Sequence, residues 1–126
     1  MKRVLILCAI FLSLTVTGRA QNLTNRFFIA YDKEAITVSS TAVPFTASKV
    51  TEAAPNSAAL AQFSVNCASG TSCVLRYTTS GTATTSTGQR ALYGDTLSIY
   101  GHDNILAFSS IRETSTDVVI NITYYR

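Results

Sequence analysis

The sequence predicts an all-β protein, a single antiparallel β-sandwich of jelly-roll or immunoglobulin-like type with seven or eight short strands. Two observations carry this prediction. Apolar and polar residues alternate with a period of two in several short segments, and turn-forming residues separate these segments at close spacing. Residues 21–126 are long enough to bury one such core and too short for two.

The first twenty residues are predicted to be a signal peptide. Lys2 and Arg3 precede the apolar run 4–16 (VLILCAIFLSLTV), and the small residues Gly18 and Ala20 suit a cleavage site. The run is shorter than the roughly 20 apolar residues that span a bilayer. We therefore expect a signal peptide at 1–20, a β-sandwich domain at 21–126, and export to the periplasm or outside the cell with no membrane span after cleavage. An uncleaved N-terminal anchor is the alternative.

The formal net charge depends on whether this signal peptide, or leader, is counted. The whole chain has 10 Lys and Arg against 7 Asp and Glu, a formal net charge of +3. Lys2, Arg3 and Arg19 lie in the leader, so residues 21–126 carry 10 − 3 = 7 basic against 7 acidic residues and no net charge. Without a basic excess the sequence predicts no nucleic-acid partner.

Two cysteines, Cys67 and Cys73, follow the leader, and in an exported chain such a pair predicts a disulfide. Closing so short a loop contributes about 2 kcal/mol in the chain-entropy model. A redox-active or metal-binding pair is the alternative. The spacing is not C-x-x-C, however, and two thiols with the single histidine do not complete a four-ligand zinc site.

The clearest alternation predicts two hairpins, at 61–77 and at 105–125. In the first, the strands on either side of the turn 68–72 each place one apolar face toward the core. In the second, strand 105–112 is expected to return across 113–117 to the alternating strand 118–125. A further strand is expected at 96–100, between the turns 93–95 and 101–104. The residues of the apolar faces are Ala61, Phe63, Val65, Cys67, Cys73, Leu75, Tyr77, Leu97, Ile99, Val118, Ile120, Ile122 and Tyr124.

The first half of the domain has weaker patterns. Strands are expected at 26–31 (RFFIAY) and 35–39 (AITVS), and a further one at 45–52, where Pro44 and Pro55 favour a sheet edge. No helix is predicted. The uncharged segment 78–88 is expected to be a long loop.

Candidate catalytic residues are few. His102 is the single histidine, and its neighbour Asp103 makes it the natural candidate for a general base. Its Gly-His-Asp-Asn setting is typical of a turn, however, and no G-x-S-x-G motif supplies a nucleophile. The carboxylate pairs Asp95/Asp103 and Asp32/Glu34 are also accounted for by turns. The sequence therefore predicts no catalytic residue and no enzyme.

The sequence also contains acidic residues, glycosylation sequons and tyrosines that could bind a metal or a sugar. Asp95, Asp103, Asn104 and Asp117 lack the D-x-D-x-D spacing of a calcium loop, so no metal or cofactor is predicted. Asn22 and Asn121 begin glycosylation sequons, which matter only in a eukaryotic source. The six tyrosines offer a stacking surface for a sugar, although we expect most of them to edge the core with their hydroxyls in water.

A set of short motifs extends over residues 35–126: 35–43 (AITVSSTAV), 75–77 (LRY), 80–88 (SGTATTSTG), 94–97 (GDTL), Asp103, Phe108 with 111–112 (IR), 116–117 (TD) and 121–124 (NITY). In these motifs the segment resembles small all-β proteins encoded among the structural genes of tailed bacteriophages. Two features depart from that pattern, since such proteins usually lack a signal peptide and the pair Cys67/Cys73 is not typical of them.

The resemblance implies a non-enzymatic virion accessory protein that decorates a capsid or tail, or an exported relative of one. Such a module is expected to bind a protein partner or to self-assemble through strand edges or loops. A secreted domain that binds a glycan or a cell surface is one alternative. A small exported inhibitor or enzyme acting through the loop 68–72 or 78–88 is the other.

Overall fold

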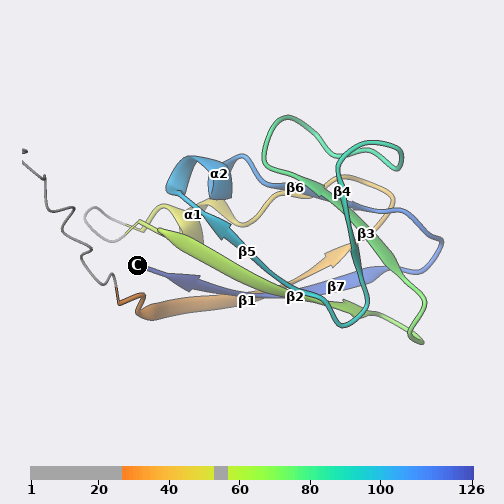
Figure 1. Cartoon of the computed structure of the whole chain (residues 1–126), viewed down its shortest axis with the longest axis horizontal. Helices are drawn as coiled ribbons and strands as arrows, with labels where there is room; N and C mark the ends of the chain where they lie inside the picture. The colour runs from red at the N-terminus through yellow and green to blue at the C-terminus, as the bar shows by residue number, and fades with distance from the viewer. Residues whose placement is uncertain (1–26, 53–56) are drawn as a thin grey trace, which may run out of the picture.

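Seven strands form two antiparallel sheets in the computed structural model, which describes residues 27–52 and 57–126 (Figure 1). The first sheet has four strands in the order β1-β7-β2-β5, and the second has three in the order β4-β3-β6. The bounds are β1 Ala30–Val38, β2 Leu60–Cys67, β3 Val74–Thr78, β4 Gln89–Leu92, β5 Thr96–Tyr100, β6 Ser109–Arg112 and β7 Val118–Tyr125. The expected all-β class is confirmed, whereas the predicted signal peptide lies outside the described residues.

The alternation seen in the sequence determines which side chains are buried. In β2, Phe63 and Val65 are fully buried, whereas Gln62 before them is exposed and Ser64 between them is half-buried. β7 follows the same period of two. The inward faces of both sheets contribute to one core, in which the ring of Phe63 from β2 lies 5.7 Å from that of Tyr77 in β3. Phe45 and Phe108 stack in the same core with ring centroids 3.8 Å apart.

Neither predicted hairpin forms. β2 pairs with β5 and β7, while β3 pairs with β4 and β6, so the disulfide turn crosses from one sheet to the other. In the same way β6 pairs with β3, and β7 pairs with β1 and β2. Alternation with a period of two specifies which face of a strand is buried, but it does not specify which strand pairs with it. Phe63 and Tyr77 therefore reach one core from two different sheets, as they would from two paired strands of a single sheet.

Two short helices replace parts of predicted strands. α1 (Ala47–Val50) lies within the expected strand 45–52, and α2 (His102–Leu106) takes the start of the expected strand 105–112. Ile105 and Phe108 are both buried, and their spacing of three residues fits a helical turn rather than a strand. Both helices lie at the same end of the molecule (Figure 1).

Two of the predicted strands form a single strand, and the predicted loop is present. The predicted strands 26–31 and 35–39 are one strand, β1, which starts at Ala30 with a register shift between Ala30 and Asp32. The segment 79–88 is a loop, as expected, and connects the paired strands β3 and β4. Among the described residues no helix is long and apolar enough to cross a bilayer.

Candidate interaction edge and groove

The predicted cysteine pair lies at a junction between the two sheets. Cys67 ends β2, Cys73 precedes β3, and the structure joins them in a disulfide with Cα atoms 5.6 Å apart. This distance lies inside the roughly 4.4–6.8 Å that a disulfide permits. The bridge therefore links two strands that share no backbone hydrogen bonds, and not the facing positions of a hairpin. The oxidation state in the native protein stays a prediction.

The candidate catalytic residues are not brought together. His102 begins α2, and its Nδ1 is buried without a hydrogen-bond partner in the described structure. Asp95 lies at the opposite end of β5, where its Oδ2 accepts a hydrogen bond from the backbone N–H of Leu92 at 2.8 Å. In the described residues no group of three metal-ligating side chains is close enough to hold an ion.

The other acidic residues singled out in the sequence have structural partners. Asp32 accepts hydrogen bonds from Lys49 Nζ at 2.8 and 2.9 Å, and Asp117 is paired with Arg112. Glu34 accepts a hydrogen bond from the hydroxyl of Tyr124, which is fully buried. The expectation that tyrosine hydroxyls lie in water is therefore wrong for Tyr124, because Glu34 points inward and offers it an acceptor.

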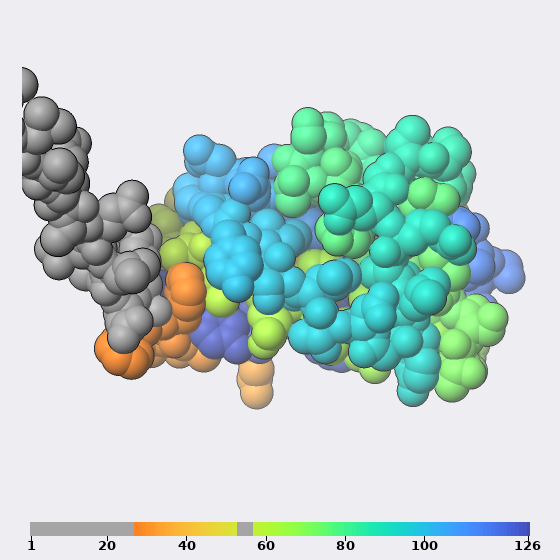
Figure 2. All heavy atoms as spheres, viewed as in Figure 1, coloured from red at the N-terminus to blue at the C-terminus, as the bar shows by residue number. Residues whose placement is uncertain are grey.

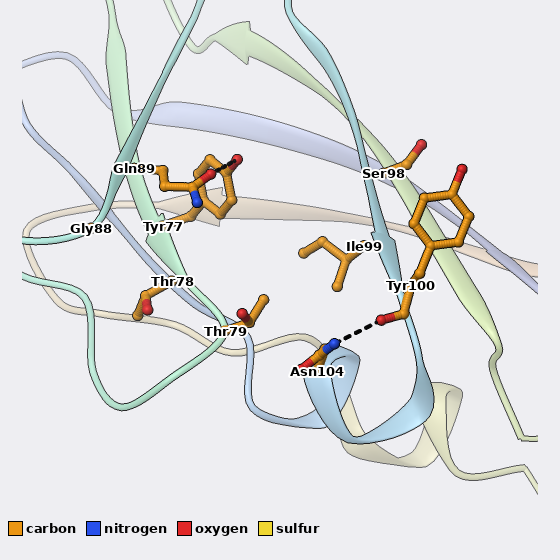
Figure 3. Close-up of a pocket in the computed structure, with 9 residues that line it drawn as sticks. All are labelled: Tyr77, Thr78, Thr79, Gly88, Gln89, Ser98, Ile99, Tyr100 and Asn104. Atoms are coloured by element: carbon orange, nitrogen blue, oxygen red, sulfur yellow. Dashed lines mark hydrogen bonds between the residues drawn. The ribbon is translucent and has the colours of Figure 1, made fainter.

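An open groove lies between β5 and the edge of the second sheet. Its volume is about 440 Å³, and Figure 3 shows its walls. The side chain of Ile99 points into it from β5, whereas Ser98 and Tyr100 point to the other side of that strand. The lining residues are Tyr77, Thr78, Thr79, Gly88, Gln89, Ser98, Ile99, Tyr100 and Asn104.

The groove is polar but carries no charge on any of these residues. Tyr77 donates a hydrogen bond from its hydroxyl to Gln89 Oε1 at 2.6 Å, and Asn104 Nδ2 donates to the backbone oxygen of Tyr100 at 2.9 Å. Burial, and then the Asp95 carboxylate, raises the pKa of Tyr77, so its phenol stays a donor at neutral pH. The lining offers hydroxyl and amide groups for hydrogen bonds, together with the aromatic ring of Tyr77.

No family model, curated protein or solved structure matches this chain.

Three of the four sheet edges are protected in the described structure. At β1, the register shift and the inward-facing Asp32 and Glu34 are devices that discourage pairing with another strand. At β6, Val43 pairs with Ser110 through hydrogen bonds of 2.8 and 2.9 Å. At β4, the Asp95 carboxylate occupies the N–H of Leu92.

Among the described residues, the fourth edge, β5, has no register shift, no inward-facing charge and no paired segment, and a side chain occupies only its last outward group, the oxygen of Tyr100, which accepts from Asn104 Nδ2. Its sequence Thr-Leu-Ser-Ile-Tyr has no charge and no proline, and its pairing with β2 has no register shift. The N–H of Val65 in β2 donates to the backbone oxygen of Asp95, and the oxygen of Val65 accepts from the N–H of Gly94, both at 2.9 Å and both on the side of β2 that faces β5. By the alternation of antiparallel ladders, the N–H and C=O groups of Thr96, Ser98 and Tyr100 then point outward. The sequence did not predict this edge, because the alternation of apolar and polar residues does not indicate the order of the strands in a sheet.

Proposed function

We propose that this protein is an exported, non-enzymatic interaction module that binds an extended segment of a protein partner along the β5 edge. The observation that carries the proposal is the contrast between β5 and the three protected edges. A strand added to an open edge gains a row of backbone hydrogen bonds, and neighbouring pockets supply selectivity for its side chains.

The groove supports this assignment because it runs beside the same edge. An added strand would place its alternate side chains over Ile99 and toward the groove wall formed by Tyr77 and Gln89. Atoms of β5 are visible at the front of the molecule in the space-filling view (Figure 2). Tyr100 keeps 61% of its surface exposed and is available for contact with a partner.

The sheets, the core and the disulfide support the proposed fold type and location of the protein. Two sheets around one core favour a β-sandwich, and the disulfide is compatible with an exported chain. The resemblance to phage virion accessory proteins remains a proposal, with a capsid or tail as the surface that the module would decorate.

The test is binding of the purified protein to virions or cell envelopes from its source. Ser98→Pro removes the outward N–H of Ser98 without removing a ladder bond to β2, so binding should fall at least tenfold. Ser98→Thr keeps the N–H and should bind as the unaltered protein does. Equal binding by all three proteins would contradict the proposal, as would a hydrolase activity that His102→Ala abolishes.

A second candidate function is glycan binding in the groove. The uncharged lining, with the ring of Tyr77 and the amides of Gln89 and Asn104, favours a neutral sugar. In a glycan-binding assay, a ligand that is lost in Gln89→Ala and retained in Ser98→Pro would favour this function over strand addition.

A further inference from the structure

The β5 edge has a sequence that is complementary to itself, and this observation identifies a partner. When β5 pairs antiparallel with a second β5 about Ser98, Leu97 faces Ile99 and Thr96 faces Tyr100 of the other copy. The apolar pair falls on the inward face, and the Thr–Tyr pair falls on the outward face, where an aromatic and a β-branched side chain pack well.

The backbone groups fit the same register. Thr96, Ser98 and Tyr100 are the residues whose N–H and C=O groups point outward, and this register sets Ser98 opposite Ser98 and Thr96 opposite Tyr100. Every outward group then meets another outward group, as a hydrogen-bonded antiparallel pair requires. The oxygen of Tyr100 already accepts from Asn104 Nδ2 but retains a second lone pair.

Charge does not oppose this contact. No residue of β5 is charged, and residues 21–126 have equal numbers of basic and acidic side chains, so two copies approach without long-range repulsion. A two-fold axis also gives a closed interface that uses the same surface on both copies.

We propose that the chain forms a homodimer in which two β5 strands pair antiparallel with Ser98 at the two-fold axis. Two four-stranded sheets then become one continuous eight-stranded sheet. This inference rests on the proposed function, because it names a second copy of the chain as the partner of the β5 edge.

The first test uses sedimentation equilibrium on the full chain over a wide range of concentrations. The unaltered protein should be dimeric. Ser98→Lys and Ser98→Glu each place like charges face to face at the axis, so each variant alone should dissociate at least tenfold more readily. Mixing the two variants should restore a dimer, because the charges are then opposite. A dimer that persists in both single variants lies elsewhere and overturns the proposal.

The second test does not depend on charge. Ser98→Cys should form an intermolecular disulfide, since Cα atoms of a hydrogen-bonded pair lie about 5.5 Å apart. Thr96→Cys is the matched control. Two Thr96 positions lie far from each other in this register, so this variant should not cross-link. Equal cross-linking of both variants, or of neither, overturns the register.

The two proposals fail separately. A chain that is monomeric at every concentration overturns the homodimer. If that monomer still binds virions or envelopes and loses binding in Ser98→Pro, the proposed function stands with a different partner. If Ser98→Pro changes neither binding nor association, both proposals fail.

Discussion

At Gly88 the backbone has a φ of +103°, and a Cβ built there would lie 2.7 Å from the backbone oxygen of Tyr77. Gly81 in the same loop has a φ of +79° but open space around it. Gly88→Ala should therefore lower the free energy of unfolding by about 3 kcal/mol, through backbone strain and a clash. Gly81→Ala should cost about 1 kcal/mol, from strain alone. Denaturant unfolding of both variants measures the difference, and equal losses would contradict it.

Tyr124 is the fully buried tyrosine that donates its hydroxyl proton to Glu34. Tyr124→Phe leaves the Glu34 carboxylate with the backbone N–H of Thr46, at 3.1 Å, as its other donor. Loss of a hydrogen bond to a charged acceptor should lower the free energy of unfolding by about 1.5–3 kcal/mol. Tyr93→Phe, at a half-exposed phenol, is the control and should change stability little.

The same phenol determines a response to alkaline pH. Burial, and then the hydrogen bond to Glu34, raises the pKa of Tyr124 far above its usual range. The folded state therefore keeps the proton while the unfolded chain loses it above about pH 10. This stabilisation is fully present below pH 10 and is lost as the pH rises further. Unfolding measured at several pH values should show the difference between the native protein and Tyr124→Phe narrowing above pH 10. A constant difference would contradict the prediction.

Among the elements, α1 is held on β1 by polar contacts. Lys49 Nζ contacts both carboxylate oxygens of Asp32 and the backbone oxygen of Lys33 at 3.1 Å, and Tyr31 donates its hydroxyl to Lys49 O at 2.6 Å. Four residues do not form a stable helix alone, so these contacts and the buried Val50 maintain the turn.

Lys49→Met should lower the free energy of unfolding at neutral pH only slightly, because the ion pair is partly exposed and screened by solvent. The hydrogen bond from Lys49 is the main reason that the pKa of Asp32 lies below its usual value of 3.8. The stabilisation is therefore present above pH 3.8 and is lost as the pH falls below it. Acid unfolding curves of the two proteins should converge at low pH, and a gap that persists there would contradict this cause.

At the scale of the whole molecule, the disulfide and the aromatic core both connect the two sheets. Reduction, or the double substitution Cys67→Ala and Cys73→Ala, should lower the free energy of unfolding by about 2 kcal/mol. The fold should survive, since Phe45 and Phe63 still pack against Phe108 from outside the disulfide loop. Circular dichroism and denaturant unfolding test this, together with thiol titration of protein isolated without reductant. Two reactive thiols in the native state would contradict the bridge.

Several features were determined by the sequence alone. The alternation in β2 and β7 identifies the buried side chains correctly, because successive side chains of a strand point to opposite faces wherever the strand lies. The glycine-containing turns at 68–72 and 93–95 and the loop 79–88 are also local properties. The three-residue spacing of Ile105 and Phe108 is also present in the sequence, and it indicates the helical turn that begins in α2 and continues to Phe108, whose N–H donates to the oxygen of Ile105.

Strand partners, and with them the candidate site, were decided only by the tertiary structure. Phe63 and Tyr77 satisfy the same alternation whether β2 and β3 are neighbours in one sheet or face each other from two sheets. Packing of the whole core selects the second arrangement, and that choice leaves β5 at an edge. Strand order depends on contacts between residues far apart in the chain, whereas the alternation of apolar and polar residues indicates only which side chains point toward the core.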